Sequence, residues 1–215
     1  MNVKNMSVRQ RVLLMLSAFM VMALGAACTI RANIGITPIS SFPYVLTFFS
    51  PLTVGEMTIL MNVFFIVLQI VLLRKDYRWY NLAQLPVMVL YGYAIDGALF
   101  LLQRIPCDAL WMRWVLCLAG TFLLATGIAC AVQANLLVAA AEGLVLAVCQ
   151  VSHRAFQSCK MAFDISLAVL SIVLSVGGLG RLEGIGVGTV LSALLLGPTI
   201  QLVTKRLFVS PQFCG

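Results

Sequence analysis

Four long stretches of this chain contain no charged residue, and their length restricts the folds open to it. They cover residues 12–30, 32–55, 114–141 and 184–204. A helix needs about 20 apolar residues to cross the hydrocarbon core of a bilayer. Only 10% of the residues are charged and 62% are hydrophobic, whereas a soluble domain carries about 25% charged residues. We therefore predict an all-α, polytopic membrane helical bundle whose main partner is membrane lipid.

The net charge of +7 does not indicate a nucleic-acid partner, because no basic stripe is interleaved with aromatic residues. Lys and Arg instead gather in short segments between the apolar stretches, as in cytoplasmic loops of membrane proteins. The seven cysteines form no CxxC or other paired framework, so neither a metal nor a cofactor is expected. No HExxH or GxSxG motif is present, and we expect no enzyme.

One pattern of small residues occurs twice, 102 residues apart. Residues 23–33 read ALGAACTIRAN, and residues 125–135 read ATGIACAVQAN. Apolar helices match one another easily by chance, but a shared pattern that ends in Ala-Asn is harder to explain in that way. The pattern predicts that the chain contains two copies of one unit.

Polar residues inside the apolar stretches support the duplication. The same displacement brings Asn62 onto Asp164, and with three additional residues in the second copy it brings Asp96 onto Gln201. Internal repeats of this kind are characteristic of transporter folds. We predict a single membrane domain, 1–215, with one repeat at about 12–103 and the other at about 114–207.

Each repeat is predicted to contain four segments, of which the second is short. In the first repeat this segment covers 38–50 and starts with Thr37-Pro38, a favourable helix start. Its 13 residues rise only about 20 Å, and the bilayer core is about 30 Å thick. A half-helix or re-entrant segment is therefore expected in each repeat. The predicted segments are 12–32, 38–50, 55–73 and 80–103, then 114–134, 138–152, 160–178 and 184–204.

The distribution of Lys and Arg bears on the number of spans. With three spans per repeat, 10 of these residues lie on the side of the termini and 4 on the other, and with four spans the division is 9 and 5. The positive-inside rule favours the first arrangement slightly. Six and eight full spans both stay open, and in each the N- and C-termini are cytoplasmic.

Two segments resemble the YczE/YyaS/YitT type of bacterial integral membrane protein. One is the turn ANIGITP at 32–38, and the other is GIGVGT at 184–189, followed by Leu196-Gly197-Pro198. The turn at 134–142 departs from the pattern, because it lacks the usual Gly and Pro. The larger relatives have an additional soluble C-terminal domain, so the end of this chain at Gly215 implies a compact, YczE-like member.

The resemblance, which covers nearly the whole chain, implies a bacterial plasma (inner) membrane protein. Some members of this type are regarded as carriers of small metabolites, with vitamin B6 compounds among the suggestions. Together with the repeats, this predicts a secondary transporter of a small polar or anionic metabolite. The alternative is a non-transporting membrane partner, such as a regulatory or assembly subunit, with paired acids and a dry centre. A homo-oligomer or an additional partner subunit is left open.

Three acidic residues in apolar segments are the first candidates for a substrate- or ion-binding site. Glu142, Asp164 and Asp96 would each cost about 2.5–3.5 kcal/mol at bilayer depth, and such acids usually line pathways. The alternative for Glu142 is a pairing with Arg31 or Arg154 that only closes the bundle. The alternative for Asp164 is an interhelical hydrogen bond. Asp96 lies eight residues before Arg104, some two turns from the expected membrane edge, and therefore ranks below the other two.

Amides and one cation complete the candidate site. Asn62, Asn33, Asn135 and Arg31 are predicted to orient a solute or to supply a charge to it. Asn33 and Asn135 end the first helix of each repeat, so the alternative for them is helix capping in the left-handed conformation. For Arg31 the alternative is a side chain that extends to the membrane interface.

Overall fold

The computed structural model describes residues 6–77, 79–104, 107–134, 136–137, 139–154 and 156–207, and its regular secondary structure over these ranges is entirely helical. Within these ranges, six helices are long and apolar enough to cross a membrane. They are α1 (Val8–Ala32), α3 (Val54–Leu73), α4 (Gln84–Leu102), α5 (Leu110–Ala134), α7 (Phe156–Leu179) and α8 (Val187–Leu207). The prediction of a multi-pass helical membrane protein is confirmed.

Two short helices separate these spans. They are α2 (Pro38–Leu46), continued by the 3-10 turn η2 (Thr47–Phe49), and α6 (Ala140–Ser152). At about 1.5 Å per residue, neither can cross a core of about 30 Å. The short second segment that the sequence predicts in each half is thus present, and among the described residues the six-span arrangement holds. Two further 3-10 turns, η3 (Arg74–Asp76) and η4 (Trp79–Ala83), connect α3 to α4.

The first helix begins four residues earlier than expected because its N-terminus is capped. The Ser7 hydroxyl accepts a hydrogen bond from the Gln10 amide, and the Gln10 side chain accepts one from the Ser7 amide. This capping box satisfies two backbone donors that the helix itself leaves unpaired. At the other end Asn33 adopts the left-handed conformation, with φ 51°, and its N–H donates to the Ile30 carbonyl. The capping alternative for Asn33 is therefore confirmed.

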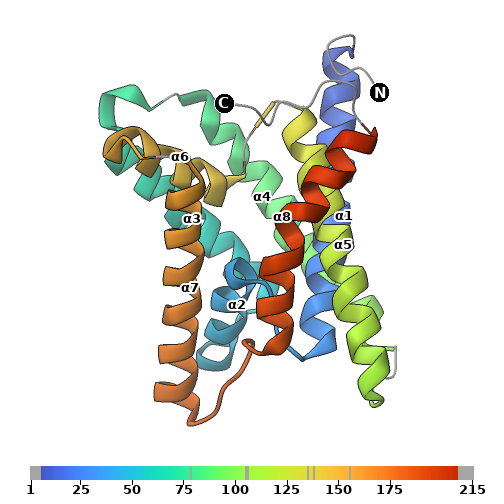
Figure 1. Cartoon of the computed structure of the whole chain (residues 1–215). Coiled ribbons are helices and arrows are strands. Elements are labelled where there is room, and N and C mark those ends of the chain that lie inside the picture. The colour runs from blue at the N-terminus through green and yellow to red at the C-terminus, as the bar shows by residue number, and fades with distance from the viewer. Residues whose placement is uncertain are drawn as a thin grey trace.

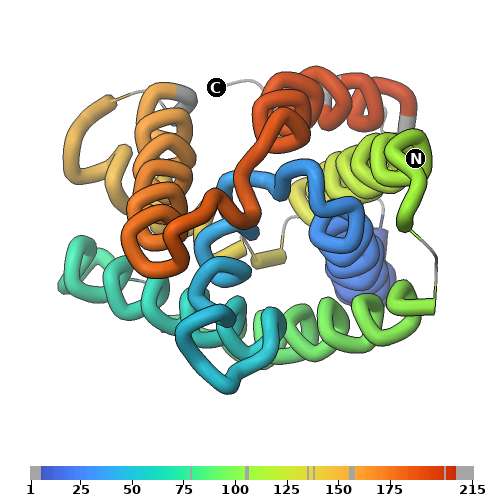
Figure 2. The backbone as a smooth tube through the Cα atoms, turned by 90° about the horizontal axis from the view of Figure 1, so that it is seen from below, coloured from blue at the N-terminus to red at the C-terminus, as the bar shows by residue number. Residues whose placement is uncertain are grey.

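The helices α1 and α5 form the most extensively packed pair and lie side by side on one side of the bundle (Figures 1 and 2). Within its most apolar 18-residue window α1 is 56% buried and α5 is 44% buried, whereas α7 is only 17% buried. The less buried spans expose large apolar side chains, as expected for surfaces in contact with lipid.

The repeated small-residue pattern lies where α1 and α5 cross. A Cβ atom on Gly25 would lie 2.7 Å from the carbonyl oxygen of Gly120. A Cβ atom on Gly127, which occupies the same place in the second copy of the pattern, would lie 2.8 Å from the carbonyl oxygen of Ala18. Helices in lipid associate closely through such small residues because their backbones must approach for good packing.

Many helices start 102 residues apart, and positions with this separation are here called corresponding positions. The helix pairs α1 and α5, α2 and α6, and α3 and α7 each begin at corresponding positions. The helix α8 begins one residue after the position that corresponds to the start of α4. The two members of each long pair run in opposite directions along the bundle (Figure 1). Packing is also reciprocal, because α2 packs on α7 as α6 does on α3, and α1 packs on α4 as α5 does on α8.

Side-chain contacts between the halves obey the same relation. The Ser41 and Ser171 hydroxyl oxygens lie 3.1 Å apart, between α2 and α7. The corresponding residues are Gly143 and Gln69, and a Cβ atom on Gly143 would lie 2.8 Å from the side-chain oxygen of Gln69. The halves differ elsewhere, because α3 packs along α4 whereas α7 and α8 scarcely touch.

The two segments that carry the family resemblance lie against each other. The Ile36 N–H donates to the Gly184 carbonyl at 3.0 Å, and the Gly188 N–H donates to the Ile34 carbonyl at 2.9 Å. A Cβ atom on Gly188 would lie 2.9 Å from the Gly35 carbonyl oxygen. The glycines before the last helix therefore permit a close backbone approach. We call the bundle end where α1 begins and α8 ends the terminal end, and the other the opposite end.

Candidate functional site

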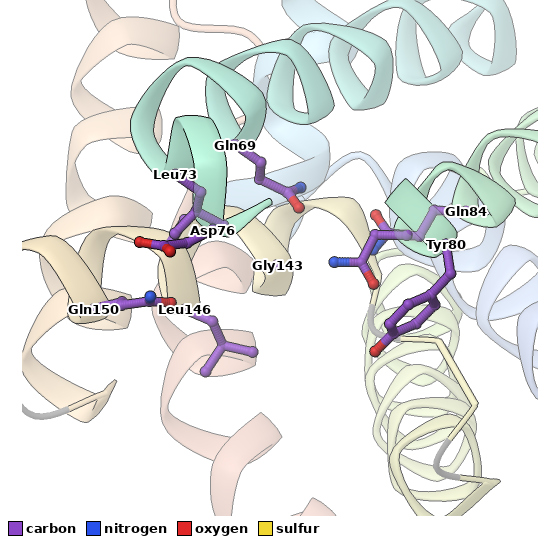
Figure 3. A pocket seen from close by; sticks show the side chains of 10 residues that line it. Gln69, Leu73, Asp76, Tyr80, Gln84, Gly143, Leu146 and Gln150 are labelled. Atoms are coloured by element: carbon purple, nitrogen blue, oxygen red, sulfur yellow. The ribbon is translucent and has the colours of Figure 1, made fainter. Parts of the chain in front are cut away.

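A pocket of about 520 Å³ lies between the last turns of α3, the turn η4 and the short helix α6 (Figure 3). Both halves of the chain contribute to its wall. Its polar lining consists of Gln69, Asp76, Tyr80, Asn81 and Gln84 from the first half and Gln150 from the second. The volume lies within the range of about 300–1,000 Å³ that is typical of small-molecule sites. The pocket is at the terminal end, because α3 ends and α4 begins there.

Two buried glutamines on opposite sides of the pocket supply its least exposed polar groups. Gln69 and Gln84 are 1% and 2% exposed. The Gln69 amide donates to the Ala140 carbonyl at 2.8 Å, which ties α3 to the start of α6. The side-chain oxygen of Gln84 is buried and has no hydrogen-bond partner. A buried acceptor without a partner costs about 1–3 kcal/mol, and a hydrogen-bond donor on a bound solute would remove this cost.

The charge of the lining is negative rather than positive. Asp76 is exposed at the end of η3, and no Lys, Arg or His is among the lining residues that the structure describes. The neighbouring Tyr77 is buried, and burial raises the pKa of its hydroxyl above the ordinary value, so this group stays neutral. Within the same described ranges, no three His, Cys, Asp or Glu side chains lie close enough to hold a metal ion.

Glu142 and Asp164 are brought together by a lysine that the sequence analysis did not single out. The Lys160 ammonium lies 2.9 Å from the Asp164 carboxylate and 3.8 Å from the Glu142 carboxylate. The partner of Glu142 is therefore Lys160 on α7, and not Arg31 or Arg154. The side chains of the three are only about a quarter to a third exposed, with 26%, 26% and 32% for Lys160, Glu142 and Asp164. Residue 143, next to Glu142, lines the pocket, so this ion cluster lies beside the pocket wall.

Asp96 joins α4 to the start of α3. One carboxylate oxygen accepts the Gly55 backbone N–H at 2.8 Å, and the other accepts the Thr53 hydroxyl at 2.6 Å. Carboxylates are favourable at helix N-termini because they satisfy free N–H groups and complement the helix dipole. These bonds give Asp96 a structural role, because they join α4 to the N-terminus of α3.

Replacing Asp96 by alanine is expected to destabilise the protein by about 1–3 kcal/mol, the usual cost of removing a charged hydrogen-bond partner. Thermal unfolding of the detergent-solubilised protein would measure this loss. Asp108, exposed in the segment before α5, provides the control variant Asp108→Ala, for which little change is expected. Equal unfolding temperatures for the two variants would contradict the structural role of Asp96.

The other predicted site residues lie apart from the pocket. Asn62 is 7% exposed and donates to the Thr58 carbonyl of its own helix at 2.8 Å. Arg31, at the opposite end, donates to the Gln103 carbonyl at 3.5 Å. Asn33 is an exposed helix cap, and Asn135 lies outside the described residues. None of the six described candidates lines the pocket, so their assignment to a solute site stays a prediction.

Sequence analysis missed Gln69 and Gln84 although a signal for Gln69 was present. It is an amide inside the apolar run of α3, which is the argument used for Asn62 on the same helix. Gln84 lies at the first position of α4, where a polar residue is ordinary, and only the tertiary structure shows that it is buried. Lys160 lies four residues before Asp164, a spacing that favours an ion pair on one helix face.

Comparison with known proteins gives a family but no established activity. The sequence profile of a family of unknown function, DUF6198, matches residues 9–205. An uncharacterized protein from Haemophilus influenzae is 31% identical over 96 residues, which are 45% of this chain and 41% of that protein. The matched part of this chain thus spans less than half of that relative. No solved structure matches the chain.

Proposed function

Since this chain belongs to the DUF6198 family of unknown function, we propose, on physical grounds, that it is a membrane carrier for a small polar solute. The pocket at the terminal end is its binding site, and the two halves of the chain form its moving parts. The role is carriage rather than catalysis. The observation that carries the proposal is a pocket of about 520 Å³ whose wall comes from both halves and contains a buried amide oxygen without a partner.

The proposal includes an inverted internal repeat. Three observations support it: helices that begin at corresponding positions, glycines that approach the facing backbone at corresponding positions, and short helices that each pack on the third helix of the other half. Three spans and one short helix per repeat place the copies in opposite orientations. In transporters with inverted repeats, the substrate site lies at the interface between the copies.

The proposed orientation places the terminal end in the cytoplasm of a bacterial cell, with the protein in the plasma membrane. It rests on the positive-inside rule. Eight described Lys and Arg residues belong to the terminal end, namely Arg9, Arg11, Arg74, Lys75, Arg154, Lys160, Lys205 and Arg206. Four belong to the opposite end, namely Arg31, Arg104, Arg113 and Arg181. The pocket in this structure would then communicate with the cytoplasm.

The lining favours a solute with hydrogen-bond donors and no net negative charge. The carbonyl of Gln84 lacks a donor, and the described lining offers Asp76 but no cation to balance an anion. Vitamin B6 compounds, which the resemblance to YczE-type proteins suggests, carry several hydroxyl donors. Pyridoxine is therefore the first solute to test, and pyridoxal phosphate is the anionic comparison. The ion cluster beside the pocket is the proposed place of coupling to an ion gradient.

The second candidate function is a non-transporting membrane partner of another complex. The pairing of Glu142 and Asp164 with Lys160 favours it, because carboxylates that form internal ion pairs can have a purely structural role without binding a solute. The polar pocket between the halves favours carriage. A direct uptake measurement separates the two functions.

Uptake of radiolabelled pyridoxine into liposomes that contain the purified protein tests the carrier directly. We expect Gln84→Met to reduce uptake roughly fivefold to tenfold, since a hydrogen bond to the solute contributes about 1 kcal/mol. The same variant should unfold at a higher temperature than the wild type without solute, because its buried unpaired carbonyl is removed. Such opposite effects are typical of residues retained for function.

The matched control is Gln103→Met, at an exposed residue directly after α4. It should change neither uptake nor unfolding temperature appreciably. Uptake by liposomes with the wild-type protein that equals uptake by empty liposomes, for neutral, cationic and anionic solutes alike, would refute the carrier and favour the partner role.

A further inference from the structure

At the opposite end of the bundle, residues that correspond to those of the pocket lie in contact with side chains of the α2 segment. Because the halves are related by corresponding positions, each pocket residue has a counterpart in the other half. Gln69 corresponds to Ser171 and Gly143 corresponds to Ser41, and both serines are fully buried. Their hydroxyls lie 3.1 Å apart, so α2 and α7 are in direct contact there, as α6 and α3 are through Gly143 and Gln69.

Aromatic side chains of the α2 segment occupy this end. The ring of Phe49 lies directly against Gly178, which corresponds to Asp76 of the pocket. The ring of Tyr44 lies against Gly184, where an added Cβ would be 2.9 Å from it. Burial, and then the neighbouring carboxylate of Glu183, raises the pKa of the Tyr44 hydroxyl, so this residue remains a neutral part of the closure.

Hydrogen bonds complete the closure. Ser175 is fully buried, and its hydroxyl donates to the Arg181 carbonyl at 2.8 Å and accepts the Glu183 N–H at 2.6 Å. The backbone bond from Ile36 to the Gly184 carbonyl, at 3.0 Å, attaches the turn before α2 to the segment before α8. The Ser175 hydroxyl and the Gly184 carbonyl are thus satisfied within the protein, whereas the side-chain oxygen of Gln84 in the pocket has no partner.

We propose that Ser41, Ser171 and Val45 belong to a second solute-binding surface, closed in this structure, and that Phe49 and Tyr44 form its gate. The inference rests on the proposed carrier function and identifies the residues through which the solute reaches the opposite side. It takes the same class of solute, a small molecule with hydrogen-bond donors and no net negative charge, because its lining offers hydroxyls. During transport the two ends exchange their open and closed arrangements, as expected for inverted repeats that move against each other.

A reporter cysteine tests the gate without any transport substrate. Val45 is fully buried and corresponds to Ala147 of the pocket, and Val45→Cys places a thiol behind the gate. A membrane-impermeant maleimide is added to oriented vesicles on the face where the opposite end of the bundle lies. The labelling rate of the same protein without the Val45→Cys change is measured as background and subtracted. Gly178→Ala inserts a methyl group where the Phe49 ring lies, so the ring must move away.

We expect Gly178→Ala to raise the labelling rate of the reporter roughly tenfold, since a small energetic change shifts a two-state equilibrium by this amount. Gly177→Ala is the matched control, because an added Cβ there meets no atom within 4 Å. Phe49→Ala, checked for monodispersity, should act like Gly178→Ala. Equal labelling in the Gly178→Ala and Gly177→Ala proteins would overturn the gate, even if the uptake screen identifies no solute.

A cross-link provides the second test. The variant Ser41→Cys/Ser171→Cys places two thiols where the hydroxyls now touch, and an added mild oxidant such as copper phenanthroline converts them to a disulfide. Oxidation should reduce uptake to the level of empty liposomes, and reduction should restore the uptake of the reduced double variant. In each single variant, whatever its own level of uptake, oxidation should cause no change. Uptake that persists in the cross-linked protein would overturn the gate while leaving the carrier function intact.

Discussion

Replacement of Gly25 by leucine is expected to prevent stable folding of the protein. The added Cβ would lie 2.7 Å from the backbone oxygen of Gly120 and 2.7 Å from the backbone nitrogen of Leu124, and a helix backbone cannot move aside as a side chain can. Overpacking usually costs about 1–3 kcal/mol, and separation of the two most buried helices should exceed that range. The measurement is the yield of monodisperse protein together with its unfolding temperature in detergent.

Gly97→Leu is the matched control, because an added Cβ at Gly97 on α4 meets no atom within 4 Å. It makes the same chemical change within a spanning helix and should leave the yield unchanged. Gly127→Leu, at the corresponding position on α5, should be as damaging as Gly25→Leu. Normal yield and unfolding temperature in the Gly25 variant would show that α1 and α5 do not approach as described.

Replacement of Lys160 by methionine is expected to destabilise the protein more than any other single change at the ion cluster. It leaves the Glu142 and Asp164 carboxylates without the ammonium that lies 3.8 and 2.9 Å from them. Breaking a fully buried ion pair costs about 3–5 kcal/mol, and a fully exposed one is worth about 0–1 kcal/mol. For side chains that are about a quarter to a third exposed, we expect a loss of about 1–3 kcal/mol in thermal unfolding.

The triple variant Glu142→Gln/Lys160→Met/Asp164→Asn removes all three charges and should recover most of this stability. Replacement of a complete buried ion cluster is often neutral, so the two variants separate charge pairing from packing. If the acids also couple transport to protons, uptake by the triple variant should lose its dependence on external pH. Equal stability of Lys160→Met and wild type would contradict the ion cluster itself.

The spans and the short helices were predictable because their causes are local. Apolar length identifies a membrane helix from the sequence alone, and the segment that starts at Pro38 is too short to be one. Helix ends were less predictable, because they depend on caps such as the reciprocal bonds of Ser7 and Gln10. The division of Lys and Arg favoured six spans only slightly, and six described helices are long and apolar enough to cross a membrane, whereas α2 and α6 are short.

The candidate site was predictable only in part. The free-energy cost of an ionisable side chain in an apolar segment identified Glu142 and Asp164 as unusual residues. The sequence could not show that α6 and α7 place both of them beside Lys160. The pocket amides Gln69 and Gln84 come from different helices, so their convergence is a property of packing. An ionisable group in an apolar segment is costly whether its role is structural or functional, and cost alone does not separate the two.

The sequence by itself determined that this chain is a helical membrane protein, because lipid leaves the backbone no other way to satisfy its hydrogen bonds along apolar runs of this length. The similar segments around Gly25 and Gly127 also predict two related halves, which stays a prediction. Only the tertiary structure decided that the pocket lies at the end where α3, α4 and α6 meet and that the Phe49 ring lies against Gly178 at the other end. The physical reason is that contacts between helices distant in the sequence place these groups, and no local sequence pattern specifies such contacts.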